Sequence, residues 1–149
     1  MQIGIPPILL TAMLAGILAL VAPMIAFRMR PARQSRIAVV AALLPPLLML
    51  LLFYSLAIHM HKSLGTWPTS IGEQGFPALL ITHDTIATNY FTVLTLISIF
   101  AWPVAFLLCA IVRRWRVCVY YLCLYGFACL ACLVAMLLAP SPFLNWWWD

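Results

Sequence analysis

The chain has 149 residues, of which 66% are hydrophobic and only 7% are charged, whereas about 25% of residues are charged in an ordinary soluble domain. Its mean hydropathy of +1.11 leaves too little polar surface to cover a globule in water. These values exclude a soluble enzyme, a disordered tail and a nucleic-acid-binding module, and they indicate an integral membrane protein.

Four apolar segments are each long enough to cross a bilayer as a helix, which takes about 20 residues. They cover residues 3–27, 37–59, 85–112 and 117–139. The second segment contains Pro45 and Pro46, which remove two helical hydrogen bonds and predict a kink against a packed neighbour. The sequence therefore predicts an all-α protein, an integral membrane four-helix bundle that forms a single domain.

The basic residues are concentrated in two short connections. Seven of the eight Lys and Arg side chains lie in residues 28–36 and 113–116, whereas the three acids and three histidines lie on the other side of the predicted spans. The positive-inside rule then places both Arg-rich connections in the cytoplasm and both termini outside, in a bacterial-type cytoplasmic membrane. Topology thus explains the net charge of +5, and no nucleic-acid partner is expected.

Residues 60–84 form the one longer connection, which the same rule places outside the cytoplasm. Glycine and proline recur in it, as is typical of turns. Tryptophan prefers the boundary between hydrocarbon and water. We therefore expect four tryptophans to act as interfacial membrane anchors: Trp67, Trp146, Trp147 and Trp148.

Polar residues gather at the outer end of the second and third predicted spans. Ser55 and His59 are four residues apart and share a helical face. His83 and Asp84 precede a stripe of polar residues at helical spacing, which consists of Thr85, Thr88, Asn89, Thr92 and Thr95. Because polar groups in hydrocarbon are costly, we expect this polar stripe to face protein or water.

Three interpretations compete for these side chains. In the first, His59, His61 and His83 bind a metal or a haem iron and Asp84 orients them, although histidines two apart on a helix point to different faces. In the second, the polar stripe with Asn89 lines a pocket for a quinone headgroup or another amphipathic ligand. The third and favoured interpretation needs no ligand: the polar groups bond across helix interfaces, at about 0.6 kcal/mol each.

Small residues predict close helix packing. Ala12 and Gly16 give the first span a small-xxx-small pattern. Cys129 and Cys132 lie in the last span, where we expect small apolar packing residues rather than a disulfide or a metal pair. No nucleotide-binding or hydrolase motif is present, so independent catalysis is not expected.

These observations favour a structural role. We expect an accessory subunit that packs laterally into a larger membrane protein complex, with the lipid bilayer and other membrane subunits as partners. The alternative is a redox, metal, haem or quinone-binding component that uses the outer His/Asp site. A second alternative is a homo-oligomeric pore or carrier lined by the polar stripe. No cofactor is required by the sequence.

Overall fold

The structure, a computed structural model, describes residues 34–68 and 75–148. Within these ranges the chain is helical apart from its turns and contains no strand. The elements are α2 (Arg36–Leu64), α3 (Ala78–Leu96), a π-helix η1 (Ile97–Ala101), α4 (Trp102–Ile111), a 3₁₀-helix η2 (Arg113–Trp115), α5 (Arg116–Met136) and α6 (Ser141–Trp148). The prediction of an all-helical protein is confirmed for this part. The predicted span 3–27, with Ala12 and Gly16, lies outside the described residues.

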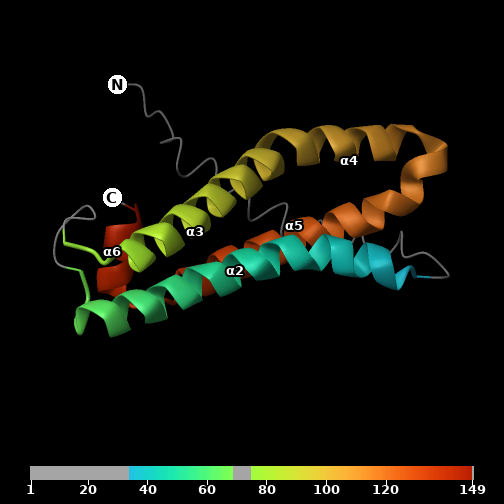
Figure 1. Cartoon of the computed structure of the whole chain (residues 1–149). Helices are drawn as coiled ribbons and strands as arrows, with labels where there is room; N and C mark the ends of the chain where they lie inside the picture. Colours follow the sequence, from blue (N-terminus) through green and yellow to red (C-terminus); the bar gives the residue numbers. More distant parts are fainter. Residues whose placement is uncertain (1–33, 69–74, 149) are drawn as a thin grey trace, which may run out of the picture.

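Three helical rods in the described part are long and apolar enough to cross a membrane, as expected for a multi-pass protein: Arg36–Leu64, Ala78–Ile111 and Arg113–Met136. At 1.5 Å per residue they measure about 44, 51 and 36 Å, which exceeds the hydrocarbon thickness of about 30 Å. In Figure 1, α3 and α4 form one long curved rod. Its α3 end packs on α2 and its α4 end packs on α5, while α2 and α5 lie against each other.

The connection between α2 and α3 is shorter than the predicted segment 60–84. Helix α2 continues to Leu64 and ends at Gly65, which takes the left-handed conformation that glycine tolerates (φ 70°). Helix α3 begins at Ala78, seven residues before the predicted start at Thr85, and the Pro77 carbonyl accepts from the amides of the first turn. The apolar run after Pro77 suits the first turn of a helix, and sequence analysis wrongly assigned it to the loop.

The proline pair does not interrupt α2, which is helical on both sides of it. Pro46 is buried and Pro45 is half-buried. The Tyr90 hydroxyl, from α3, donates to the Pro45 carbonyl over 3.1 Å. A packed neighbour therefore lies beside the prolines, as a membrane helix with missing backbone bonds requires.

The sequence does not predict helix α6, which follows the last predicted span and begins between Pro140 and Pro142. Pro142 occupies the first turn of α6, where a missing amide hydrogen costs little. Phe143 is fully buried in the core, with its ring 5.0 Å from that of Phe53 of α2. The short helix thus closes one end of the bundle, where it is drawn in red in Figure 1.

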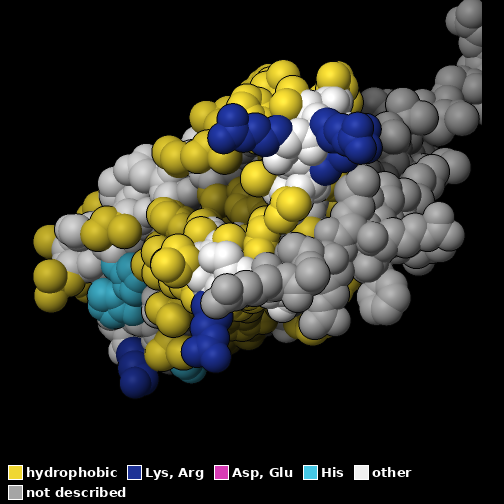
Figure 2. Space-filling model, turned by 90° about the vertical axis from the view of Figure 1, so that its right-hand side faces the viewer, with side chains coloured by type: hydrophobic (Ala, Val, Ile, Leu, Met, Phe, Trp, Pro, Cys, Tyr) yellow, Lys and Arg dark blue, Asp and Glu magenta, His cyan; other side chains and the backbone are white. Residues whose placement is uncertain are grey.

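The fold separates the described arginines from the histidines, whereas Lys62 lies at the histidine end of α2. Gln34 and the Ser35 amide donate to the hydroxyls of Tyr120 and Tyr121 over 3.0 Å, so the starts of α2 and α5 lie together. This end carries the described arginines, which are Arg36, Arg113, Arg114 and Arg116. Figure 2 shows dark-blue basic groups on a surface that is otherwise mainly hydrophobic where it is described. The histidines lie at the opposite ends of the helices, as the sequence pattern predicts.

Candidate functional site

His59 and His83 form a hydrogen-bonded pair between α2 and α3. Their Nδ1 atoms are 3.0 Å apart, and the rings are tilted by 35° with centroids 5.2 Å apart. The other ring nitrogen of His83, Nε2, lies 3.1 Å from the Ser55 hydroxyl. Ser55 and His59 are one helical turn apart on α2, so they reach His83 from the same face, as the sequence spacing predicts.

The position of the Ser55 hydroxyl proton determines which groups donate and which accept in this cluster. Ser55 donates its single hydroxyl proton to the Leu52 carbonyl over 2.9 Å, so its oxygen accepts from His83. His83 therefore carries a proton on Nε2. When both rings are neutral, its Nδ1 is a lone pair and accepts from Nδ1 of His59. In this cluster each group donates to the next one: His59 to His83, His83 to Ser55, and Ser55 to the backbone of α2.

His61 does not join this pair. It is exposed, and it stacks on Trp67 with ring centroids 4.5 Å apart. Because α2 stays helical to Leu64, the two histidines of α2 point to different faces. The described residues contain no group of three or more His, Cys, Asp or Glu placed to hold a metal ion. The predicted three-histidine set is thus not brought together, and rings in direct contact leave no space for a haem between His59 and His83.

The polar stripe of α3 faces away from the described bundle. Thr85, Thr88, Asn89 and Thr92 are exposed and Thr95 is half-buried. The buried side of α3 carries Leu80, Ala87 and Leu94, which recur every seven residues. Within the described residues the polar stripe is therefore mostly exposed, and the expectation that it faces protein or water stays a prediction.

Part of the polar stripe is satisfied by the helix itself. Thr85 donates to the Ile81 carbonyl over 2.8 Å, and Thr88 donates to the Asp84 carboxylate over 3.3 Å. Asp84 is half-buried beside His83. The Asn89 side chain, in contrast, makes no hydrogen bond within residues 34–68 and 75–148. It is the side chain of the stripe with the largest unmet hydrogen-bonding capacity, because an amide has two donor hydrogens and an accepting oxygen.

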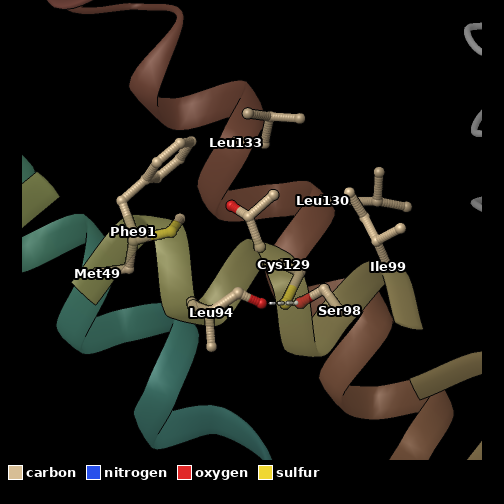
Figure 3. A pocket seen from close by; sticks show the side chains of 9 residues that line it. Met49, Phe91, Leu94, Ser98, Ile99, Cys129, Leu130 and Leu133 are labelled. Atoms are coloured by element: carbon tan, nitrogen blue, oxygen red, sulfur yellow. Dashed lines mark hydrogen bonds between the residues drawn. The ribbon is translucent and has the colours of Figure 1, made fainter. Parts of the chain in front are cut away.

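A cavity of about 210 Å³ lies where the α3–α4 rod crosses α2 and α5. Side chains from these helices surround it in Figure 3: Met49, Phe91, Leu94, Thr95, Ser98, Ile99, Cys129, Leu130 and Leu133. Ile99 and Leu133 are 58% and 39% exposed, so the cavity opens at the surface. It touches the polar stripe only at Thr95 and includes no histidine, so this cavity is not the quinone pocket predicted along the stripe.

A small polar cluster that the sequence did not predict lies beside the cavity. Ser98 donates to the Leu94 carbonyl over 2.7 Å and lies 2.7 Å from the Tyr125 hydroxyl. The sulfur of Cys129 is 4.0 Å from the Ser98 oxygen. Ser98 belongs to the π-helix η1, a form that often marks functional positions. One feature of the sequence indicates this position: Ser98 continues the three-residue spacing of Thr92 and Thr95.

The remaining predicted residues lie in packing positions. Cys132 is buried in the core and Cys129 is half-buried. The predicted anchor residues Trp67, Trp146 and Trp147 are half-buried against the core, whereas Trp148 is 49% exposed. Most of the tryptophan surface at this end therefore packs within the bundle.

Comparison with known proteins finds no protein-family model, no curated protein and no solved structure that matches this chain.

Proposed function

We propose that this protein is an accessory subunit that packs laterally into a larger membrane protein complex and has no catalytic activity of its own. The supporting observation is the exposed polar side of α3, and above all Asn89. The membrane would be a bacterial-type cytoplasmic membrane, with the arginine end of the bundle inside, because the described arginines share one end of the helices.

The depth of Asn89 makes its exposure costly. It is eleven residues from the start of α3, or about 16 Å along a rod of about 51 Å. If the rod is centred in the bilayer, the hydrocarbon begins about 10 Å from its end. An amide at that depth needs hydrogen-bond partners, and water does not supply them there.

A helix of another subunit is the partner that suits this surface. Thr92 is exposed on the next turn of α3 beside Asn89, so the two side chains present donors and acceptors along one line. A neighbouring transmembrane helix with a polar side chain would bond to them, and each such bond contributes about 0.6 kcal/mol. The bonds would fix which helix docks and in which register.

The test is site-specific photo-crosslinking in native membranes. A photoreactive residue replaces Asn89, and the matched control replaces Phe127, which lies near the middle of α5 and is 51% exposed. We expect position 89 to link to one other membrane protein, identified by mass spectrometry, and position 127 to link mainly to lipid.

The other outcomes separate the alternatives. A product of twice the chain mass from position 89 would support the homo-oligomeric pore or carrier instead. An internal link without a change in mass would show that residues 1–33 cover this surface. Links to lipid alone at both positions would contradict the subunit role.

A further inference from the structure

We infer that His59 and His83 form a two-histidine site for a divalent transition-metal ion at the histidine end of the bundle. This inference is independent of the proposed subunit role, because it concerns the isolated chain. It differs from the site predicted from sequence, because neither His61 nor Asp84 is a ligand.

The spacing of the two rings is close to that of a metal site. The Nδ1 atoms face each other at 3.0 Å. Two imidazoles on a tetrahedral zinc ion, each at about 2.0–2.1 Å, have their nitrogens about 3.3 Å apart. To admit the ion, the nitrogens need to separate by a few tenths of an ångström, and both rings need to turn so that their lone pairs point at the ion beside the line that joins them. Imidazole nitrogen suits zinc, copper and nickel.

Ser55 holds His83 in the protonation state that a metal ligand needs. The Ser55 oxygen accepts from Nε2 of His83 because the Ser55 proton is used on the Leu52 carbonyl. Nδ1 of a neutral His83 is therefore a lone pair that points at His59. Metal-binding histidines almost always donate their other ring N–H to an oxygen in this way, which fixes the tautomer and the ring orientation.

Metal binding requires only a proton shift at His59. In the metal-free pair, Nδ1 of His59 carries the shared proton. The ion takes its place, and the proton moves through solvent to Nε2 of His59, which has no hydrogen bond to a described residue. A neutral pair thus binds the ion without net proton release, and both nitrogens bind it through lone pairs.

The site is accessible to ions from water. Both rings are half-buried, and His83 is five residues from the start of α3, or about 8 Å along the helix. Two nearby charges have opposite signs, so their effects on a bound cation offset each other. Asp84 follows His83, and Lys62 lies one turn after His59. Two protein ligands leave the remaining coordination positions to water, so we expect weaker binding than at a structural site with four ligands.

The first experiment is a Zn²⁺ titration of the full-length protein, purified in detergent with a tag that contains no histidine. We expect one Zn²⁺ per chain. His59→Gln and His83→Gln should each weaken binding by at least tenfold, and Ser55→Ala by about tenfold, as for other residues that orient a ligand. The control His61→Gln changes an exposed histidine two residues away and should leave the affinity within twofold.

The second experiment uses the unmodified chain, so it does not depend on how the variants fold. Spectroscopy of the Cu²⁺-loaded protein that counts bound imidazoles should find two. No Zn²⁺ binding by the unmodified chain, a count other than two, or equal losses in His61→Gln and His59→Gln would overturn the inference.

Discussion

Phe143 is predicted to hold the end of the bundle together. Its side chain is 0% exposed, and its ring centroid lies 5.0 Å from that of Phe53 and 6.2 Å from those of Trp67 and Trp147. Replacing a buried phenylalanine by alanine costs about 3–5 kcal/mol through lost transfer free energy and the cavity left behind. Phe143 is at the end of the bundle, where α6 can shift to fill space. We therefore expect Phe143→Ala to lower the free energy of unfolding by about 3 kcal/mol.

The assay is unfolding of the purified protein by a denaturing detergent, followed by circular dichroism. Leu138→Ala is the matched control, because Leu138 lies in the turn before α6 and is 79% exposed. We expect the control to change the unfolding free energy by less than about 0.5 kcal/mol. Equal changes in the two variants would refute the packing of α6 against α2.

Three further predictions test the packing and the orientation of the helices. Tyr90→Phe removes a hydroxyl that donates to a backbone carbonyl of α2 over 3.1 Å, and should lower the unfolding free energy by about 0.6 kcal/mol. A Cβ on Gly126 would lie 3.1 Å from the Trp102 ring, so Gly126→Leu should destabilise by about 1–3 kcal/mol. In Gly126→Ala, a gain in helix propensity of about 1 kcal/mol should offset most of the strain. Cysteines placed at Trp67 and Arg114, in a chain without its own cysteines, should react from opposite sides of the membrane, and labelling from one side would contradict the orientation.

The sequence predicts the long helices well because hydrophobic length alone defines them. Their ends are harder to predict, because a helix continues until a backbone signal stops it. Gly65 stopped α2 five residues beyond the predicted end, and Pro77 started α3 seven residues early. The π-helix η1 has five residues and α6 has eight, so each is too short to be recognised from a repeated hydrophobic pattern. Both depend on how neighbouring helices pack.

For the candidate sites too, residue spacing predicts which side chains share a helical face, but not which residues of another helix they contact. The shared face of Ser55 and His59 follows from their spacing, but their contact with His83 depends on how α3 lies against α2. The direction of the polar stripe depends on the rotation of α3 about its axis, which is set by Leu80, Ala87 and Leu94, the residues that face the bundle. Apolar residues also flank the stripe, so composition alone does not identify the buried side.

The most direct test of the subunit role is the mass of the particle extracted from native membranes in a mild detergent. The chain itself has a mass of 16.7 kDa. We predict a larger particle that contains a second, different membrane protein, and we predict that Asn89→Leu releases the chain from it. A monomer of 16.7 kDa, stable without a partner and unaffected by Asn89→Leu, would contradict the account.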